Sequence, residues 1–167
     1  MSSPNGPIFL IGFMGAGKSA CADELARGLG RVAMDTDAII EARDGRPIER
    51  IILEDGEPAF RSLERQVVRQ VIDADAVVAT GGGTFLSASN RVELKRHGLT
   101  VWLDVTLAEA RRRVGACGGR PLWPDDPLEL RALFERRRAA YALCARRVAA
   151  EPGDPAEVAL RISRVIA

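Results

Sequence analysis

Short apolar runs alternate with longer amphipathic segments along this chain of 167 residues. The first run, Ile8–Ile11, is rich in β-branched residues and apolar on both faces, with a proline before it and a glycine after it. This pattern is typical of a buried central strand. We predict further strands at 31–34, 76–79, 99–103 and 147–150, the last of them weak.

Helices are predicted between these runs. A long one begins at the Gly-Glu-Pro sequence 56–58 and continues to residue 73, with an apolar stripe at helical spacing formed by Phe60, Leu63, Val67, Val68, Val71 and Ile72. Another follows residue 19, and the rest are predicted at 38–43, 48–53, 87–97, 107–114, 128–144 and 155–166. Strands that alternate with helices predict an α/β fold with a parallel sheet covered on both faces.

The bulk properties favour one small intracellular domain. The chain shows no internal repeat or long linker, and only the Gly- and Pro-bearing stretch 115–127 interrupts the helical pattern. A net charge of +1 gives no strong field toward nucleic acid or membrane, so we expect neither as a partner. Three widely spaced cysteines and a single histidine argue against a disulfide framework or a zinc site. With no membrane-length apolar run and no secretory pattern at residues 1–7, we expect a cytoplasmic protein, and we expect a monomer.

The strongest chemical signal follows the first strand. Residues 12–19, Gly-Phe-Met-Gly-Ala-Gly-Lys-Ser, fit the pattern G-x-x-x-x-G-K-[ST], between a predicted strand and a predicted helix. In this pattern the glycines let backbone N–H groups point inward at phosphate oxygens, and the helix N-terminus adds partial positive charge. Lys18 would reach the β- and γ-phosphates, and the Ser19 hydroxyl would bind Mg²⁺. The alternative is a glycine-rich turn followed by a chance Lys-Ser pair, but the context favours a nucleoside triphosphate site.

Two other strand ends carry unusual residues. Asp35 and Asp37 follow the second strand, and we expect them on the same side of an extended segment. One carboxylate could hold Mg²⁺ and the other could accept a proton from an attacking hydroxyl, whereas the alternative is a pair of helix-capping acids. Gly81, Gly82 and Gly83 follow the third strand and offer backbone N–H groups with no side chains in the way, unless they form only a flexible turn. Ligands of parallel α/β sheets bind beyond the carboxyl ends of the strands, so we expect these loops to converge with residues 12–19.

Arginines supply the remaining candidate groups, since a guanidinium binds carboxylate or phosphate with two parallel hydrogen bonds. Arg61 lies just after the Gly-Glu-Pro sequence, Arg120 lies in the irregular stretch, and residues 136–138 are three consecutive arginines. The alternative for each is a solvated surface arginine. Three consecutive helical residues span roughly 200° of arc at about 100° each, so only one or two of them can face a site.

The combination, order and spacing of these motifs resembles the shikimate kinase family over nearly the whole chain. The resemblance is carried by GFMGAGKS at 12–19, Asp-Thr-Asp at 35–37, the stretch from Gly56 through Arg61 to Glu64, the glycines 81–83, Arg-Pro-Leu at 120–122 and the arginines before Tyr141. It implies a phosphate-loop fold like that of nucleoside monophosphate kinases, with three α/β/α layers and a five-stranded parallel sheet. It also implies a lid at about 115–127 and a substrate-binding helical region at about 37–61.

By the same resemblance the chain transfers the γ-phosphate of ATP to the 3-hydroxyl of shikimate, on the route to aromatic amino acids. The nucleotide would be contacted by Gly15, Ala16, Gly17, Lys18, Ser19, Ala20, Arg113 and the lid residue Arg120. Ser19 and Asp35 would hold Mg²⁺, the latter through water. Lys18, Asp37 and Arg120 would act in catalysis, with Asp37 as the candidate base.

Shikimate itself would be held by Asp37, Arg61, Gly81, Gly82, Gly83 and a second carboxylate-binding arginine. In the family that arginine lies four residues before a tyrosine, which indicates Arg137, but Ala139 and Ala140 stand where Pro-Leu is usual and Arg138 is the alternative. Two other functions stay open at this point. One is another small-molecule kinase, acting on gluconate or a nucleoside monophosphate, and the other is a non-catalytic nucleotide-binding paralogue.

Overall fold

The computed structural model describes residues 6–116 and 122–167. In these residues one parallel sheet is formed by β1 (Ile8–Ile11), β2 (Val32–Asp35), β3 (Ala76–Ala79), β4 (Leu99–Asp104) and β5 (Arg146–Ala149). The strand order is β2-β3-β1-β4-β5, so β1 is central and pairs with both β3 and β4. The predicted parallel α/β sheet is therefore confirmed, with the strand that is apolar on both faces at its centre.

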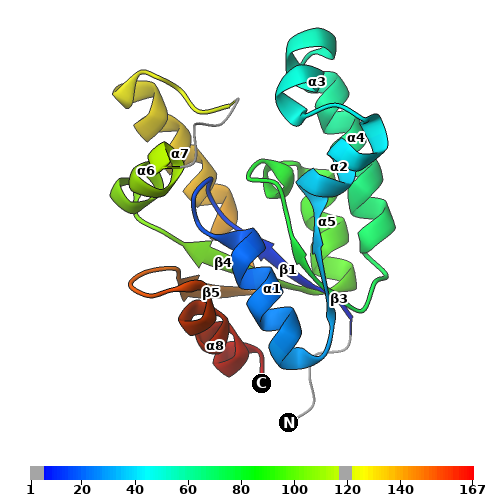
Figure 1. Ribbon diagram of the computed structural model, residues 1–167, viewed down its shortest axis with the longest axis vertical. Helices are drawn as coiled ribbons and strands as arrows, with labels where there is room; N and C mark the ends of the chain where they lie inside the picture. The colour runs from blue at the N-terminus through cyan, green and yellow to red at the C-terminus, as the bar shows by residue number, and fades with distance from the viewer. Residues whose placement is uncertain (1–5, 117–121) are drawn as a thin grey trace.

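Helices cover both faces of this sheet (Figure 1). They are α1 (Lys18–Leu29), α2 (Thr36–Asp44), α3 (Ile48–Asp55), α4 (Glu57–Val71), α5 (Ala88–His97), α6 (Leu107–Ala116), α7 (Pro127–Tyr141) and α8 (Pro155–Ile166), with a short 3₁₀ helix η1 (Thr84–Leu86) after β3. Helices α1 and α8 pack against each other in front of the sheet in Figure 1, and α5 lies behind it. Among the described residues, none of the helices has the length and apolar character that a membrane crossing requires.

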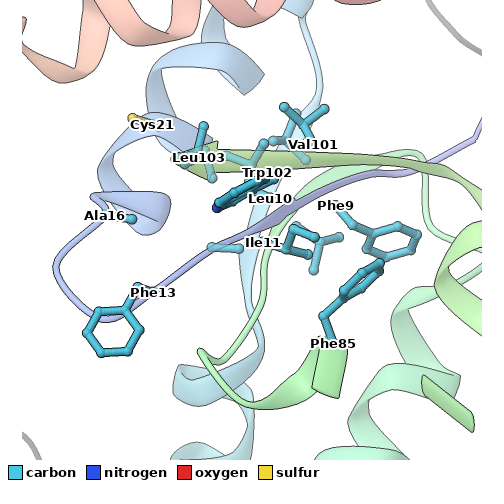
Figure 2. Packing of buried hydrophobic residues seen from close by; sticks show 14 of the residues in the cluster. Phe9, Leu10, Ile11, Phe13, Ala16, Cys21, Phe85, Val101, Trp102 and Leu103 are labelled. Atoms are coloured by element: carbon cyan, nitrogen blue, oxygen red, sulfur yellow. The ribbon is translucent and has the colours of Figure 1, made fainter. Parts of the chain in front are cut away.

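The core lies between the sheet and its helices. All four side chains of β1 are fully buried, and Figure 2 shows Phe9, Leu10 and Ile11 among side chains of β4 and α1. Burial of each such side chain contributes about 1.5–3 kcal/mol to stability, so the central strand is among the most strongly anchored parts of the fold. Trp102 of β4 is also buried in this cluster. The loop that leaves β1 is thus attached to a rigid base.

One local prediction is wrong. Asp35 and Asp37 do not share one side of an extended segment, because the strand ends at Asp35 and Asp37 already lies in the first turn of α2. The Asp35 carboxylate accepts hydrogen bonds from the backbone N–H groups of Asp37 (2.9 Å) and Ala38 (3.3 Å), which caps this helix. Capping stabilises a helix by about 1 kcal/mol, and it starts the helix two residues before the predicted position.

Other boundaries differ by a few residues. Helix α7 begins at Pro127, where Asp126 caps it, and ends at Tyr141, three residues before the predicted end. Helix α6 continues to Ala116, so both ends of the predicted lid are helical. Residues 117–121 of that lid lie outside the described residues.

The predicted substrate-binding region, 37–61, comprises α2, α3 and the beginning of α4. A cluster of ion pairs joins the two short helices. Arg46, in the link between them, contacts Asp44 at 2.6 Å, Glu54 at 2.8 Å and Asp55 at 2.5 Å. Because the acids come from the ends of both helices, the arginine holds α2 and α3 together as one unit beside the site.

Candidate active site

The glycine loop, residues 12–17, connects the carboxyl end of β1 to the N-terminus of α1. Gly15 has a φ of 79°, and a Cβ at this position would lie 2.8 Å from the carbonyl oxygen of Ala110. Gly17 caps α1 with a φ of 84°, which also favours glycine. The Lys18 ammonium donates hydrogen bonds to the carbonyl oxygens of Gly12 (2.9 Å) and Phe13 (3.0 Å), so its charge is held over the loop.

An acid and a hydroxyl meet beside this loop. The Ser19 hydroxyl donates to Oδ2 of Asp35 at 2.5 Å, while Oδ1 of the same carboxylate caps α2. The capping role and a role near the phosphates therefore coexist in Asp35. Mg²⁺ prefers oxygen ligands and keeps several waters and phosphate oxygens. In the part of the chain that the structure describes, no group of three or more metal-binding side chains occurs, and this hydroxyl-carboxylate pair fits such an ion.

The glycine turn, residues 81–83, contacts three of the predicted substrate residues in succession. A Cβ at Gly81 would lie 2.7 Å from Oδ1 of Asp37, and one at Gly82 would lie 3.2 Å from Nη1 of Arg137. At Gly83 it would lie 2.5 Å from Nη1 of Arg61. The absence of side chains thus brings an acid and two guanidinium groups from α2, α4 and α7 against one turn.

Arg61 is held by two acids of its own helix. Its guanidinium pairs with Glu57 at 2.8 Å and with the buried Glu64 at 3.1 Å. Burial works to lower the pKa of Arg61, but the charges and hydrogen bonds of Glu64 and Glu57 outweigh it and raise the pKa above its usual value. The arginine is therefore permanently charged and fixed in position.

Arg137 and its neighbour Arg138 face different surroundings. Arg137 is only 5% exposed, and burial lowers the pKa of its guanidinium. Its Nε is buried and has no hydrogen-bond partner among the described residues. Arg138 instead contacts Asp104 at 3.5 Å and lies over the rings of Trp102 and Phe134. Between the two alternatives left by the sequence, only Arg137 points into the same space as the glycine turn.

These groups line one cavity of about 680 Å³. Its walls include Lys18, Ser19, Asp35, Asp37, Arg61, the glycines 81–83 and Arg137, together with Gly15, Gly17, Ala20 and Arg113. Of the other predicted site residues, Ala16 lines an adjacent cavity and Arg120 lies outside the described residues. The glycine loop, a hydroxyl–carboxylate pair and an acid with two arginines thus line one cavity, an arrangement that suits phosphoryl transfer to a small anionic alcohol.

Comparison with known proteins decides the family. The model of the family "SKI: Shikimate kinase" matches residues 14–167. The chain belongs to the shikimate kinase family. A shikimate kinase from Synechococcus elongatus is 41% identical over 163 residues, which are 95% of this chain and 85% of that protein. One from Thermosynechococcus vestitus is 46% identical over 138 residues, 81% of this chain and 75% of its own length.

Solved structures agree with this assignment. The shikimate kinase from Acinetobacter baumannii in complex with shikimate superposes with a TM-score of 0.91 at 33% identity, over 96% of this chain and 92% of that one. A gluconokinase from Sinorhizobium meliloti reaches 0.61 at 16% identity over 96% and 93% of the two chains, a likeness that shows the fold alone. The chain is therefore a shikimate kinase by family, with the phosphate-loop kinase fold that the sequence predicts.

In this shikimate kinase family member the second cavity adjoins the glycine loop. It has a volume of about 640 Å³ and is lined by Ala16, Gly17, Cys21, Arg113 and the loop at 150–155. Arg113 forms the partition, since its guanidinium donates to the carbonyl oxygens of Gly15 (3.3 Å), Ala16 (3.4 Å) and Ala150 (3.1 Å). If the phosphates of a nucleotide lie on the glycine loop, its nucleoside part has room in this second cavity.

Sequence analysis gave no role to two buried polar residues of the site. Glu64 is 1% exposed, accepts a hydrogen bond from Thr84 at 2.7 Å and lies against Gly81. Thr36 is fully buried, and its hydroxyl accepts a hydrogen bond from the Gly81 N–H at 3.0 Å. For Glu64 a signal was present, because this acid lies four residues after Phe60, on the apolar stripe of α4. For Thr36 the sequence offers no such signal.

Proposed function

We propose that the chain phosphorylates the 3-hydroxyl of shikimate with ATP, giving shikimate 3-phosphate and ADP for aromatic amino acid biosynthesis. The observation that carries the proposal is the glycine turn, whose successive residues contact Asp37, Arg137 and Arg61 in the cavity that also holds Lys18. Shikimate is a small ring with one carboxylate and three hydroxyls. An acid and two guanidinium groups are the complement of that chemistry.

In the proposed complex the shikimate carboxylate lies between Arg61 and Arg137. Arg137 is buried and Arg61 is partly buried, which strengthens their attraction for an anion. The buried Nε of Arg137 offers a further donor to that carboxylate. Asp37, which lies against Gly81, accepts hydrogen bonds from the ring hydroxyls and so fixes which of them faces the nucleotide.

The nucleotide is proposed to lie with its phosphates on the glycine loop. Lys18 would exchange its contacts with the loop carbonyls for the β- and γ-phosphates. Ser19 and Asp35 would hold Mg²⁺, which when bound neutralises charge on the phosphate oxygens. The base would enter the second cavity beside Arg113. Arg120 stays a prediction, to be placed over the nucleotide by the lid.

The reaction then needs positioning and charge neutralisation more than covalent help. The 3-hydroxyl oxygen forms a bond to the γ-phosphorus, and the bond from that phosphorus to the β,γ-bridging oxygen breaks, so ADP leaves. Asp37 takes up the hydroxyl proton. Lys18 stabilises the charge that develops on the transferred group.

A coupled ADP-release assay tests this function directly. Purified enzyme with ATP and Mg²⁺ should release ADP with shikimate, and much more slowly with gluconate or nucleoside monophosphates. Faster turnover of gluconate would favour the first alternative from the sequence. ATP binding without turnover of any acceptor would favour a non-catalytic paralogue. Within this proposal we expect the enzyme to act in the cytoplasm, and as a monomer because one chain supplies the loop, the acids and both arginines.

A further inference from the structure

Tyr141 is the one tyrosine of the chain and the last residue of α7. Its side chain is 1% exposed, and its hydroxyl donates a hydrogen bond to the carbonyl oxygen of Gly82 at 2.5 Å. The ring packs against Trp102, with 6.1 Å between the ring centroids. Tyr141 does not line the cavity, so it contacts the glycine turn from the side that faces away from the cavity.

Arg137 lies against the same glycine, Gly82. Arg137 and Tyr141 are four residues apart on α7, which places their side chains on one face of the helix. Burial raises the pKa of the Tyr141 hydroxyl, while the positive charge of the nearby Arg137 acts in the opposite direction. Nη1 of Arg137 lies 3.2 Å from the position that a Cβ of Gly82 would occupy. Gly82 therefore accepts a hydrogen bond from the phenol and lies against the arginine.

The three groups differ in their capacity to donate and accept hydrogen bonds. The guanidinium can only donate, the carbonyl oxygen can only accept, and a neutral hydroxyl does both. Because burial keeps the hydroxyl protonated, it can donate to the Gly82 carbonyl. Without the hydroxyl, Gly82 would lose the hydrogen bond that holds it beside the arginine, while the ring could still pack against Trp102.

We propose that Tyr141 is a positioning residue for shikimate binding, whose hydroxyl holds the Gly82 carbonyl and so fixes the glycine turn against which the Arg137 guanidinium lies, in place for the substrate carboxylate. The inference rests on the proposed function, since it assigns the carboxylate to Arg137. It assigns no catalytic role to Tyr141, which touches no reacting group. Its effect should therefore appear in the affinity for shikimate rather than in the rate of the chemical step.

The test is Tyr141→Phe, which removes the hydroxyl and keeps the ring. The KM for shikimate should rise about tenfold, while kcat and the KM for ATP change by less than about twofold, on the scale of one hydrogen bond to a charged group. The matched control is Ser163→Ala, which removes another hydroxyl-to-carbonyl hydrogen bond (3.0 Å, to Ala159) within α8. It should leave all three constants unchanged. An unchanged KM for shikimate in Tyr141→Phe, or equal rises in both KM values, would overturn the inference.

Two further measurements separate positioning through Arg137 from general loosening of the fold. In an Arg137→Ala background, Tyr141→Phe should add less than about twofold to the KM for shikimate, because the group that it positions is gone. A shikimate analogue with a carboxamide in place of the carboxylate should bind wild type and Tyr141→Phe about equally. Full additivity, or the same loss for the analogue, contradicts the inference. If wild type itself fails to phosphorylate shikimate, the proposed function has failed instead.

Discussion

Gly83→Ala tests the contact between the glycine turn and Arg61, one of the two arginines proposed to bind the shikimate carboxylate. Gly83 has a φ of −98° and a ψ of −13°, a backbone conformation that alanine adopts without strain. The effect of the substitution must therefore come from what the new methyl group touches. It would lie 2.5 Å from Nη1 and 2.7 Å from Cζ of Arg61.

The size of the effect follows from these distances. An ordinary contact between a methyl carbon and a nitrogen or carbon atom is about 3.5 Å or more, so the guanidinium must retreat by about 1 Å. It cannot do so freely, because ion pairs with Glu57 and Glu64 hold it in place. A hydrogen bond between charged groups contributes about 1.5–3 kcal/mol. Loss of one such bond to shikimate should raise its KM by about tenfold to a hundredfold.

Steady-state kinetics in the coupled ADP-release assay measure this rise, with shikimate and ATP varied in turn. Gly28→Ala is the matched control, since no atom lies within 4 Å of its added Cβ and it lies within α1. That variant should keep both KM values and gain up to about 1 kcal/mol of stability from helix propensity. A KM for shikimate within about twofold of wild type in Gly83→Ala would refute the contact argument. An equal rise in the KM for ATP would show damage to the fold instead.

Three other predictions follow from the site and its surroundings. Lys18→Met should lower kcat by about a thousandfold in the same assay, because it removes a charge at the transferred phosphoryl group; near-normal turnover would rule out that role. Arg137→Ala should raise the KM for shikimate by about a hundredfold, whereas Arg138→Ala should change it by less than about threefold, since that arginine is engaged with Asp104; the reverse order would assign the clamp to the other residue. Burial raises the pKa of the Cys21 thiol from near 9 to about 11, so the folded state binds the proton more tightly than the unfolded state. Thermal melts should thus show wild type losing up to about 3 kcal/mol of stability from pH 9 to 11, and Cys21→Ala should lack this loss.

The sequence predicted the sheet and its loops well because both depend on short stretches. Ile8–Ile11 is apolar on both faces and is the fully buried central strand. The loop that follows is recognisable because its glycines and Lys18 occupy fixed positions along the chain. Since the carboxyl ends of parallel strands share one edge, convergence of the three loops could also be expected before any coordinates existed.

The choice between the two arginines and the start of α2 depended on contacts between distant residues, which no local sequence pattern encodes. The choice between Arg137 and Arg138 is set by the rotation of α7, and that rotation is fixed by Phe134, Tyr141 and the pairing of Arg138 with Asp104. The start of α2 was misplaced because Asp35 serves as both helix cap and partner of Ser19. A single residue with two roles satisfies either interpretation of its sequence pattern. Only the fold shows that both apply.

The central claim is that shikimate lies with its carboxylate between Arg61 and Arg137 and its 3-hydroxyl at Asp37, facing the glycine loop. A crystal structure of the enzyme with shikimate, ADP and Mg²⁺ tests this arrangement most directly. The account predicts both guanidinium groups within about 3 Å of the carboxylate oxygens and Asp37 within hydrogen-bond distance of the 3-hydroxyl. Shikimate bound with its carboxylate away from both arginines, or with its 3-hydroxyl turned from Lys18, would contradict it.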